Sequence, residues 1–453
     1  MDILIAILSV LAAIMILVFV HEMGHFLFAK LFKMRVDRFS VGFPPKIVGK
    51  QIGETEYVLG ATPLGGYVKI AGMVDESLDT DNLESEPEPW EFRAKPVWQR
   101  ILVITAGVIF NIILAGVIFI GIKFAYGDAQ ALATEDGSVY VADSTLAYNI
   151  GLRTGDRVLS ISGQPFDPYD GLKSFEALLA DPLTIEVERD GRVISFDGPD
   201  DITTQLGRAG GLGLSFEPSV IGQVSPESAA DKAGLQAGDR ITNIDGAAVQ
   251  FWVQMSNRIE ASEGAPILVR WVRPDSVSTP ETGSLTPVGI TTGGKVYETT
   301  VTPMSDNGRP YIGVLPGVRY EEYGLGESIV GGITDTWLNT KLTFISLKRI
   351  FTGRENIREN LGGPVMVAKI TGQAAQAGGR AFWSIVAMLS ITLAIVNIMP
   401  VPALDGGHLV FLIYEGITRR EPSLKVRMVM QQVGMVLLLC LMAFLVFNDL
   451  LRL

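Results

Sequence analysis

Two of the three histidines in this chain stand four residues apart, in the sequence His21-Glu22-Met23-Gly24-His25. On a helix, residues four positions apart share one face, so the two imidazoles are placed to hold a single Zn²⁺ ion. Glu22 lies beside them, where its carboxylate can activate a water molecule bound to the metal. The spacing of these side chains therefore predicts a zinc hydrolase.

The HExxH motif follows a stretch that is apolar from Ile3 to Val20 apart from Ser9, which is long enough to cross a bilayer. Ionisable groups at membrane depth are costly and therefore mark functional sites. The alternative is a pair of structural histidines, but no metal would then compensate for placing them beside a glutamate at the edge of a bilayer. We therefore expect an enzyme that works inside a membrane.

Four stretches have the length and composition of membrane spans, and 48% of all residues are hydrophobic. The predicted spans cover residues 3–28, 101–122, 381–399 and 428–447. The first span lacks the basic start and the cleavage site of a signal peptide, so we expect it to be retained. The fold class predicted is a polytopic α-helical membrane protein with four transmembrane helices.

Basic residues are concentrated in the two short loops, between the first two spans and between the last two. They are Lys30, Lys33, Arg35, Arg38, Lys46, Lys50, Lys69, Arg93, Lys95, Arg100, Arg419, Arg420, Lys425 and Arg427. The positive-inside rule then places these loops in the cytoplasm and both termini outside. The long segment 123–379 is predicted to be extracytoplasmic, and HExxH to lie near the cytoplasmic side.

Charge and cysteine content argue against a nucleic-acid-binding protein and against a disulfide-stabilised one. The net charge of −12 argues against nucleic-acid binding. Acidic residues between Asp75 and Glu91 indicate a solvated loop. The single cysteine, Cys440, lies in the last span, so no disulfide can form within the chain.

A catalytic zinc site takes three protein ligands, and the best candidate for the third is Asp405. It follows the third span in the sequence Asn397-Ile-Met-Pro-Val-Pro-Ala-Leu-Asp405-Gly-Gly-His408, and the predicted orientation brings it to the same membrane side as HExxH. His408 is the alternative ligand. The two prolines, Pro400 and Pro402, break the helix, and broken backbone at this depth must be covered by protein or line a wet cavity.

HExxH together with Asn-x-x-Pro-x-Pro-x-Leu-Asp-Gly resembles the site-2 proteases, and with the repeat described below it resembles the bacterial RseP type of intramembrane zinc metalloprotease. The resemblance implies Zn²⁺ held by His21, His25 and Asp405, with Glu22 as the general base. It also implies a multi-pass protein of the bacterial inner membrane. Such a protein cleaves single-span substrates, such as anti-sigma factors or remnant signal peptides, after a site-1-type protease has cut them outside.

Two asparagines lie in otherwise apolar spans. The resemblance implies that Asn397 contacts the unwound substrate or the developing oxyanion. Residues Gly107 to Asn111 resemble the family's glycine-to-asparagine motif, although Val108 stands where a proline is common, and Asn111 is assigned with Asn397 to substrate or oxyanion binding. For both asparagines, an interhelical hydrogen bond is the alternative role.

Residues 55–70 are predicted to form a hairpin, with short strands at 57–59 and 67–70 around the turn sequence 62–66. An open strand edge can pair with an extended substrate. We therefore assign Gly65, Gly66 and Tyr67 to substrate binding, together with Pro400 and Pro402. The resemblance implies a membrane-dipping β-hairpin near the metal, and an ordinary cytoplasmic hairpin is the alternative.

An internal repeat organises the extracytoplasmic segment: Gly151-Leu-Arg-Thr-Gly-Asp-Arg157 recurs as Gly234-Leu-Gln-Ala-Gly-Asp-Arg240. It resembles tandem β-rich PDZ domains, at 126–217 and 218–316. These domains either capture a new substrate C-terminus or exclude substrates whose outer domain is intact, and we favour the filter.

The remaining segments complete the predicted organisation. Residues 325–352 alternate apolar and charged side chains and are expected to form an amphipathic helix on the outer membrane surface. The two membrane halves are then 1–122 and 380–453. Two other classes stay open at this point. A membrane zinc carrier or sensor would need the ligands but not Glu22, and a PDZ scaffold would lack peptidase activity.

Overall fold

The computed structural model describes residues 2–73, 86–134, 136–169, 171–209, 211–275, 287–306, 309–356, 358 and 362–451. The chain divides into two compact units. The first contains residues 1–126, 323–353 and 357–453, and the second contains residues 127–322 and 354–356. Most of the acidic run predicted as a solvated loop, residues 75–85, lies outside the described residues.

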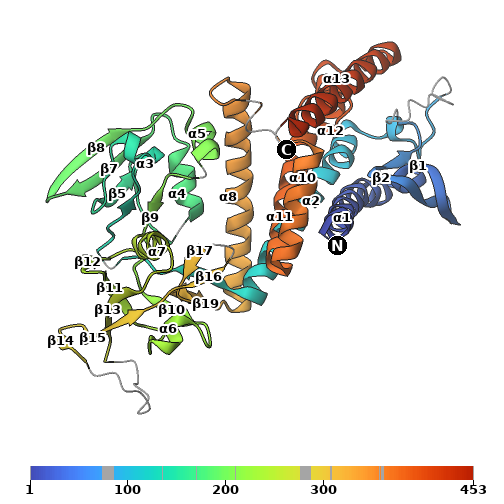
Figure 1. The fold of residues 1–453 in the computed structure, drawn as a ribbon. Coiled ribbons are helices and arrows are strands. Elements are labelled where there is room, and N and C mark those ends of the chain that lie inside the picture. Colours follow the sequence, from blue (N-terminus) through green and yellow to red (C-terminus); the bar gives the residue numbers. More distant parts are fainter. Residues whose placement is uncertain are drawn as a thin grey trace. The chain divides into compact units, whose positions relative to one another are not determined.

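Within the described residues, four helices of the first unit are long and apolar enough to cross a bilayer (Figure 1). They are α1 (Asp2–Leu31), α2 (Val97–Tyr126), α11 (Gly379–Ile398) and α13 (Leu424–Leu450). These helices coincide with the four predicted spans to within four residues at each end. The prediction of four apolar helices is therefore confirmed.

A shared apolar core joins α1, α2 and α11. Ala13 of α1, Ala115 of α2 and Val386 of α11 are fully buried in it. The contact between α1 and α2 is close because Gly24 has no side chain: a Cβ there would lie 2.5 Å from the carbonyl oxygen of Ala106. The HExxH segment is thus held directly against the backbone of α2.

Strands β1 (Val36–Ile52) and β2 (Thr55–Ile70) form an antiparallel pair that turns at Gly53. Both strands bend, so Phe39 has partners on both sides, Tyr57 and Val68. The predicted hairpin within 55–70 is therefore wrong in its pairing. Segments 57–59 and 67–70 are strands, but they flank 38–41 instead of pairing with each other. The cause is a fold-back of β1 at Gly42, whose φ is +91°, a bend that strand patterning does not reveal.

The β1–β2 sheet packs on the membrane helices through one apolar face. Phe39 and Val68 share a buried cluster with Ala29 of α1, Val103 of α2 and Leu412. Among the described residues, segment 66–70 pairs through β1 on one side. Gly66 of this segment lies against α1, since a Cβ there would stand 3.1 Å from Cγ of Glu22.

Further helices of the first unit are η1 (Phe92–Ala94), α8 (Leu325–Phe351), α10 (Pro364–Ala377) and α12 (Asp405–Thr418). Helix α8 occupies the segment predicted to be amphipathic. It packs on α2 through the Lys123–Asp335 ion pair of 3.1 Å, and it exposes Trp337 and Phe344 on another face. Asp449 at the end of α13 accepts hydrogen bonds from the N–H groups of Gly363 and Met366 at the start of α10.

The second unit repeats one order of elements. The first copy contains β4 (Tyr140–Val141), α3 (Leu146–Ile150), β5 (Arg157–Ile161), β6 (Gln164–Pro165), α4 (Gly171–Leu178), β7 (Thr184–Arg189), β8 (Arg192–Asp197), α5 (Ile202–Ala209) and β9 (Leu214–Ser215). The second contains β10 (Ile221–Val224), α6 (Ala229–Lys232), β11 (Arg240–Ile244), β12 (Ala247–Ala248), α7 (Trp252–Ala261), β13 (Ile267–Arg273), β14 (Gly289–Thr291), β15 (Gly294–Val301), β16 (Met304–Asp306), β17 (Arg309–Tyr311) and β18 (Val314–Pro316). Strands β3 (Asp128–Ala131) and β19 (Val318–Glu321), where the chain enters and leaves the unit, pair with each other.

The sheets of the two copies share one strand order. The order β6-β5-β7-β8 of the first copy corresponds to β12-β11-β13-β15 in the second, where β14 adds a fifth strand at the edge. Strand β4 pairs with β9 in the first copy, as β10 pairs with β18 in the second. The repeat in the sequence is therefore a repeat in the fold, and the β-rich character predicted for this segment is confirmed.

Each copy buries the aspartate of its Gly-Asp motif against an arginine. Arg189 donates to Asp156 at 2.6 Å, and Arg273 donates to Asp239 at 2.7 Å. Hydrogen bonding to Asp239 raises the pKa of Arg273. Both arginines also donate to the backbone carbonyl of the glycine that opens the motif. The repeat thus extends to an arginine that comparison of the two short motifs did not reveal.

The segment 354–356 belongs to the second unit although it follows α8 in the chain. Glu355 is buried, and its carboxylate accepts hydrogen bonds from the backbone N–H of Thr204 at 2.8 Å and from its hydroxyl at 2.6 Å. These contacts satisfy free N–H groups in the first turn of α5. They fix the end of the α8 linker to the first copy of the repeat.

Candidate metal centre

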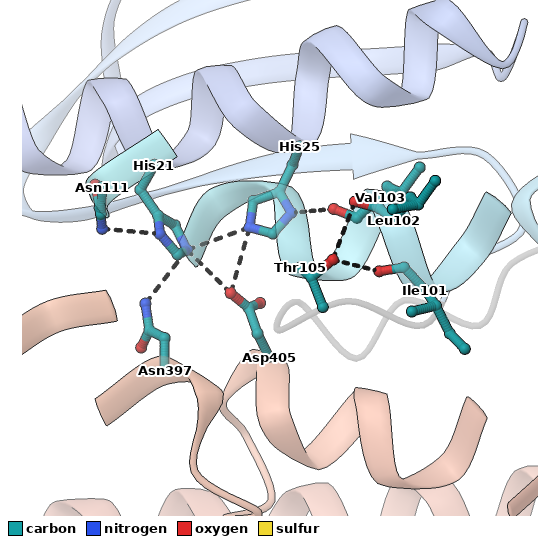
Figure 2. A network of polar contacts seen from close by, with 9 residues as sticks. All are labelled: His21, His25, Ile101, Leu102, Val103, Thr105, Asn111, Asn397 and Asp405. Atoms are coloured by element: carbon teal, nitrogen blue, oxygen red, sulfur yellow. Dashed lines mark hydrogen bonds and ion pairs between the residues drawn. The ribbon is translucent and has the colours of Figure 1, made fainter. Parts of the chain in front are cut away.

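Helices α1 and α12 bring three candidate ligands together (Figure 2). His21 and His25 lie one turn apart on α1, and each is 8% exposed. Asp405 is the first residue of α12, where the helix dipole favours a carboxylate. The connection 399–404 after α11 carries the chain to this position, because Pro400 and Pro402 lie in it and prevent α11 from continuing.

The three candidate ligand atoms have the spacing of a tetrahedral zinc site. Nε2 of His21 lies 3.2 Å from Nε2 of His25 and 3.2 Å from Oδ2 of Asp405, and His25 Nε2 lies 3.5 Å from the same oxygen. Tetrahedral ligands bonded to zinc at about 2.0–2.1 Å are separated by about 3.3 Å. Three corners of a tetrahedron are thus present in the protein, which leaves a fourth for water or substrate.

The carboxylate of Asp405 supplies a second indication of a cation. Its buried Oδ2 atom faces the two imidazole Nε2 atoms at 3.2 and 3.5 Å but makes no well-formed hydrogen bond with the described residues. A buried, unsatisfied carboxylate oxygen is costly, and a bound cation removes that cost. The donor set of two imidazoles and one carboxylate is one that zinc takes in catalytic sites. The residues present therefore fit Zn²⁺.

Helix α2 contacts the outer side of both imidazoles. Nδ1 of His25 donates a hydrogen bond to the carbonyl oxygen of Val103, at 2.8 Å, which leaves Nε2 free to bind a metal. Nδ1 of His21 lies 3.2 Å from the side-chain amide of Asn111, which is fully buried. Between these two contacts stands Gly107, where a Cβ would lie 2.4 Å from Nε2 of His25 and 2.8 Å from Nε2 of His21.

A cavity adjoins the ligand cluster, and several predicted site residues line it. Glu22, Gly66 and Tyr67 face it together with the three ligands, so the HExxH glutamate and the β2 edge share one space. His408 also lines the cavity, but it contributes no atom to the ligand cluster found among the described residues. The geometry favours Asp405 over His408 as the third ligand.

Of the remaining predicted residues, Asn397 contacts the ligand cluster, whereas Gly65, Pro400 and Pro402 do not line the cavity. Asn397 lies at the cluster, with its amide nitrogen 3.3 Å from Nε2 of His21 (Figure 2). Gly65 lies against the ring of Phe43, where a Cβ would approach to 2.4 Å. Pro402 packs against α13, because a Cβ at Gly434 would lie 2.1 Å from its carbonyl oxygen. Pro400 and Pro402 therefore shape the backbone of the connection and are not among the residues that line the cavity.

Sequence reasoning missed one buried ion pair that positions α12. Arg100 of α2 donates to the carboxylate of Glu415 of α12 through both terminal guanidinium nitrogens, Nη1 at 3.0 Å and Nη2. Their side chains are 5% and 9% exposed. The pair joins positions 315 residues apart, so no local pattern in the sequence indicates it.

Comparison with known proteins agrees with this geometry. The family model of peptidase family M50 matches residues 9–441. The chain is 32% identical over 475 residues to the regulator of sigma-E protease RseP of Escherichia coli, covering 98% of each protein. It is 31% identical over 484 residues to a Vibrio cholerae protein whose name describes a zinc metalloprotease, covering 100% of each. A Haemophilus influenzae regulator of sigma E protease is 30% identical over 98% of both chains. The chain therefore belongs to peptidase family M50, the site-2 protease family, and is a zinc metalloprotease of the membrane.

Proposed function

We propose that this protease cuts single-span membrane proteins at a zinc ion held by His21, His25 and Asp405, with Glu22 as the general base. The observation that carries the proposal is the cluster itself. Three ligand atoms at tetrahedral spacing face a cavity that also contains Glu22 and the edge of β2. A zinc carrier or sensor would need neither Glu22 nor a strand edge at this place.

The residues around the cluster have separate tasks in peptide hydrolysis. Zinc, when bound, polarises the scissile carbonyl and lowers the pKa of a water molecule at the open position. Glu22 takes a proton from the attacking water and passes it to the leaving amine. The amide N–H group of Asn397, next to the ligand atom of His21, is placed to donate to the oxyanion that forms on the substrate.

Segment 66–70 offers a strand edge that can bind the substrate once its helix has unwound. Carbonyl groups of a helix are engaged in their own hydrogen bonds, so the scissile segment must unwind. An extended substrate can then pair with the edge of β2. Gly66 keeps this edge close to the base, because a Cβ there would lie 3.1 Å from Cγ of Glu22 and 2.8 Å from a methyl carbon of Val18.

The cellular setting follows from the family and from charge. We assign the protein to the bacterial inner membrane, with both termini and the repeat unit outside and the site near the cytoplasmic side, on the distribution of Lys and Arg. Its substrates in this proposal are single-span proteins such as anti-sigma factors or remnant signal peptides, cut first by a site-1-type protease. The two repeat copies, as PDZ-like domains, act as a filter against substrates with an intact outer domain.

The direct test uses the purified full-length protein in detergent with model transmembrane helices. The wild-type chain should cleave them, and Glu22→Gln should bind zinc as the wild type does while losing cleavage. Zinc binding without cleavage of any such helix by the wild type would contradict the proposal. Equal cleavage by the Glu22→Gln variant would remove the assigned base.

A further inference from the structure

Three residues of α2 form a stripe that faces the two histidines of α1. Val103, Gly107 and Asn111 are spaced four apart, so they share one face of the helix. Val103 contacts His25, Asn111 contacts His21, and Gly107 lies between the two rings. The stripe and the two histidines have the same i, i+4 spacing, so each ring contacts one end of the stripe and Gly107 makes room for both.

The ligand geometry fixes which ring nitrogen of each histidine carries a proton. Both Nε2 atoms belong to the cluster with Asp405, at 3.2 and 3.5 Å from its oxygen. A neutral imidazole that binds a metal through Nε2 carries its hydrogen on Nδ1 and must donate it to an acceptor. His25 meets this requirement through the carbonyl oxygen of Val103. For His21, the backbone carbonyl of Gly107 lies within hydrogen-bonding reach, and the side chain of Asn111, 3.2 Å from Nδ1, is a second acceptor if it presents its oxygen.

The side-chain amide of Asn111 has two orientations, related by a rotation that exchanges its oxygen and nitrogen. In one orientation, Nδ2 faces Nδ1 of His21 at 3.2 Å (Figure 2), which would set two N–H groups against each other once zinc is bound. Oδ1 then has no hydrogen-bond partner among the described residues, so its surroundings do not favour that orientation. The opposite orientation gives His21 a side-chain acceptor at Nδ1, in addition to the backbone carbonyl of Gly107.

We infer that Asn111 is the positioning residue that accepts a hydrogen bond from Nδ1 of His21 and thereby fixes the tautomer and the ring for zinc. This inference rests on the proposed zinc site and replaces the substrate or oxyanion contact expected for Asn111 from the sequence. Asn111 is fully buried, so it touches the reaction only through His21. The hydroxyl of Ser390 on α11 donates to the backbone carbonyl of Asn111 at 2.7 Å and anchors α2 there.

The test measures zinc affinity of the purified full-length protein against a competing chelator, with no peptide substrate present. Asn111→Leu keeps the side-chain size but removes the acceptor, so affinity should fall by about 10- to 100-fold. Asn111→Asp keeps an acceptor and should bind zinc as tightly as the wild type or more tightly. Ser390→Ala is the matched control, because it removes a hydrogen bond at the same residue without changing the partner of His21.

A second measurement does not depend on the folding of Asn111→Leu. The chain has three histidines, so ¹⁵N-histidine labelling of the zinc-loaded protein yields three imidazoles to assign by NMR. We expect a proton on Nδ1 of His21, and a shift of that signal alone in Asn111→Asp. Wild-type zinc affinity in Asn111→Leu, or a His21 ring bound to zinc through Nδ1, would overturn the inference while leaving the proposed enzyme intact. A wild-type chain that binds no zinc would overturn both.

Discussion

Gly107 of α2 lies so close to His25 of α1 that a Cβ on the glycine would stand 2.4 Å from Nε2 of the histidine. This nitrogen is one of the three atoms of the ligand cluster. The space that a side chain would fill at position 107 is therefore the space that the metal-binding face of the imidazole pair requires. The zinc site therefore depends on the close packing of α1 against α2 that the glycine at position 107 permits.

The variant Gly107→Ala should consequently lose zinc and activity together. The added methyl group displaces the imidazoles, and a misplacement of about 1 Å is enough to lower the rate by about 100-fold. Zinc content and cleavage of a model transmembrane helix provide the measurement. Gly116→Ala is the control on the same helix, since its Cβ would meet Thr336 at an ordinary 3.6 Å. Full zinc occupancy in Gly107→Ala would contradict this account of the site.

The Arg100–Glu415 pair should be needed for stability in a way that depends on both partners. Glu415→Leu leaves a buried guanidinium without its counter-charge, which costs about 3–5 kcal/mol. The double variant Arg100→Met with Glu415→Leu should recover most of that loss, because no charge is then buried. Thermal unfolding of the purified variants measures both effects. A single variant as stable as the wild type would show that the pair does not fix α12.

Much of this site was predictable from the sequence because its ligands follow periodic rules. The i, i+4 spacing of His21 and His25 and the arrival of Asp405 after the third span both follow from helix geometry and membrane orientation. The apolar spans were equally accessible, since bilayer thickness sets their length.

The parts that escaped prediction depend on contacts between distant segments. His25 donates to the backbone carbonyl of Val103, and because every residue has such a carbonyl, the identity of residue 103 does not reveal this contact. The pairing of β2 depends on a fold-back of β1 at Gly42, so two correctly placed strands were given the wrong partners. Arg273 pairs with Asp239 across 34 residues, beyond the reach of the short repeated motif.

Gly66 provides a prediction that separates substrate binding from metal binding. In Gly66→Val, the side chain would press on Val18 and on Glu22, where a Cβ alone reaches 2.8 and 3.1 Å. We expect cleavage of transmembrane substrates to fall by at least about tenfold while zinc affinity stays within about twofold of the wild type. Measurement of both quantities on one preparation tests this, and loss of zinc would place the effect in the ligands instead of the strand edge.

The filter role of the repeat unit predicts a gain of activity on deletion. Strands β3 and β19 pair at the entry and exit of the unit, with Ala131 opposite Val318, so a short linker can replace residues 132–317. The shortened protein should cleave substrates that retain their outer domain, which the full-length chain leaves intact. The same deletion in a Glu22→Gln background is the control. An unchanged requirement for the prior cut would contradict the filter.

The most direct test of the central claim is the zinc content of purified Asp405→Ala beside that of His408→Ala. Both side chains face the same cavity, but only Asp405 contributes an atom to the described ligand cluster. The account predicts one zinc per chain in the wild type and in His408→Ala, and loss of zinc and cleavage in Asp405→Ala. Retention of tightly bound zinc by Asp405→Ala, with loss in His408→Ala, would contradict it.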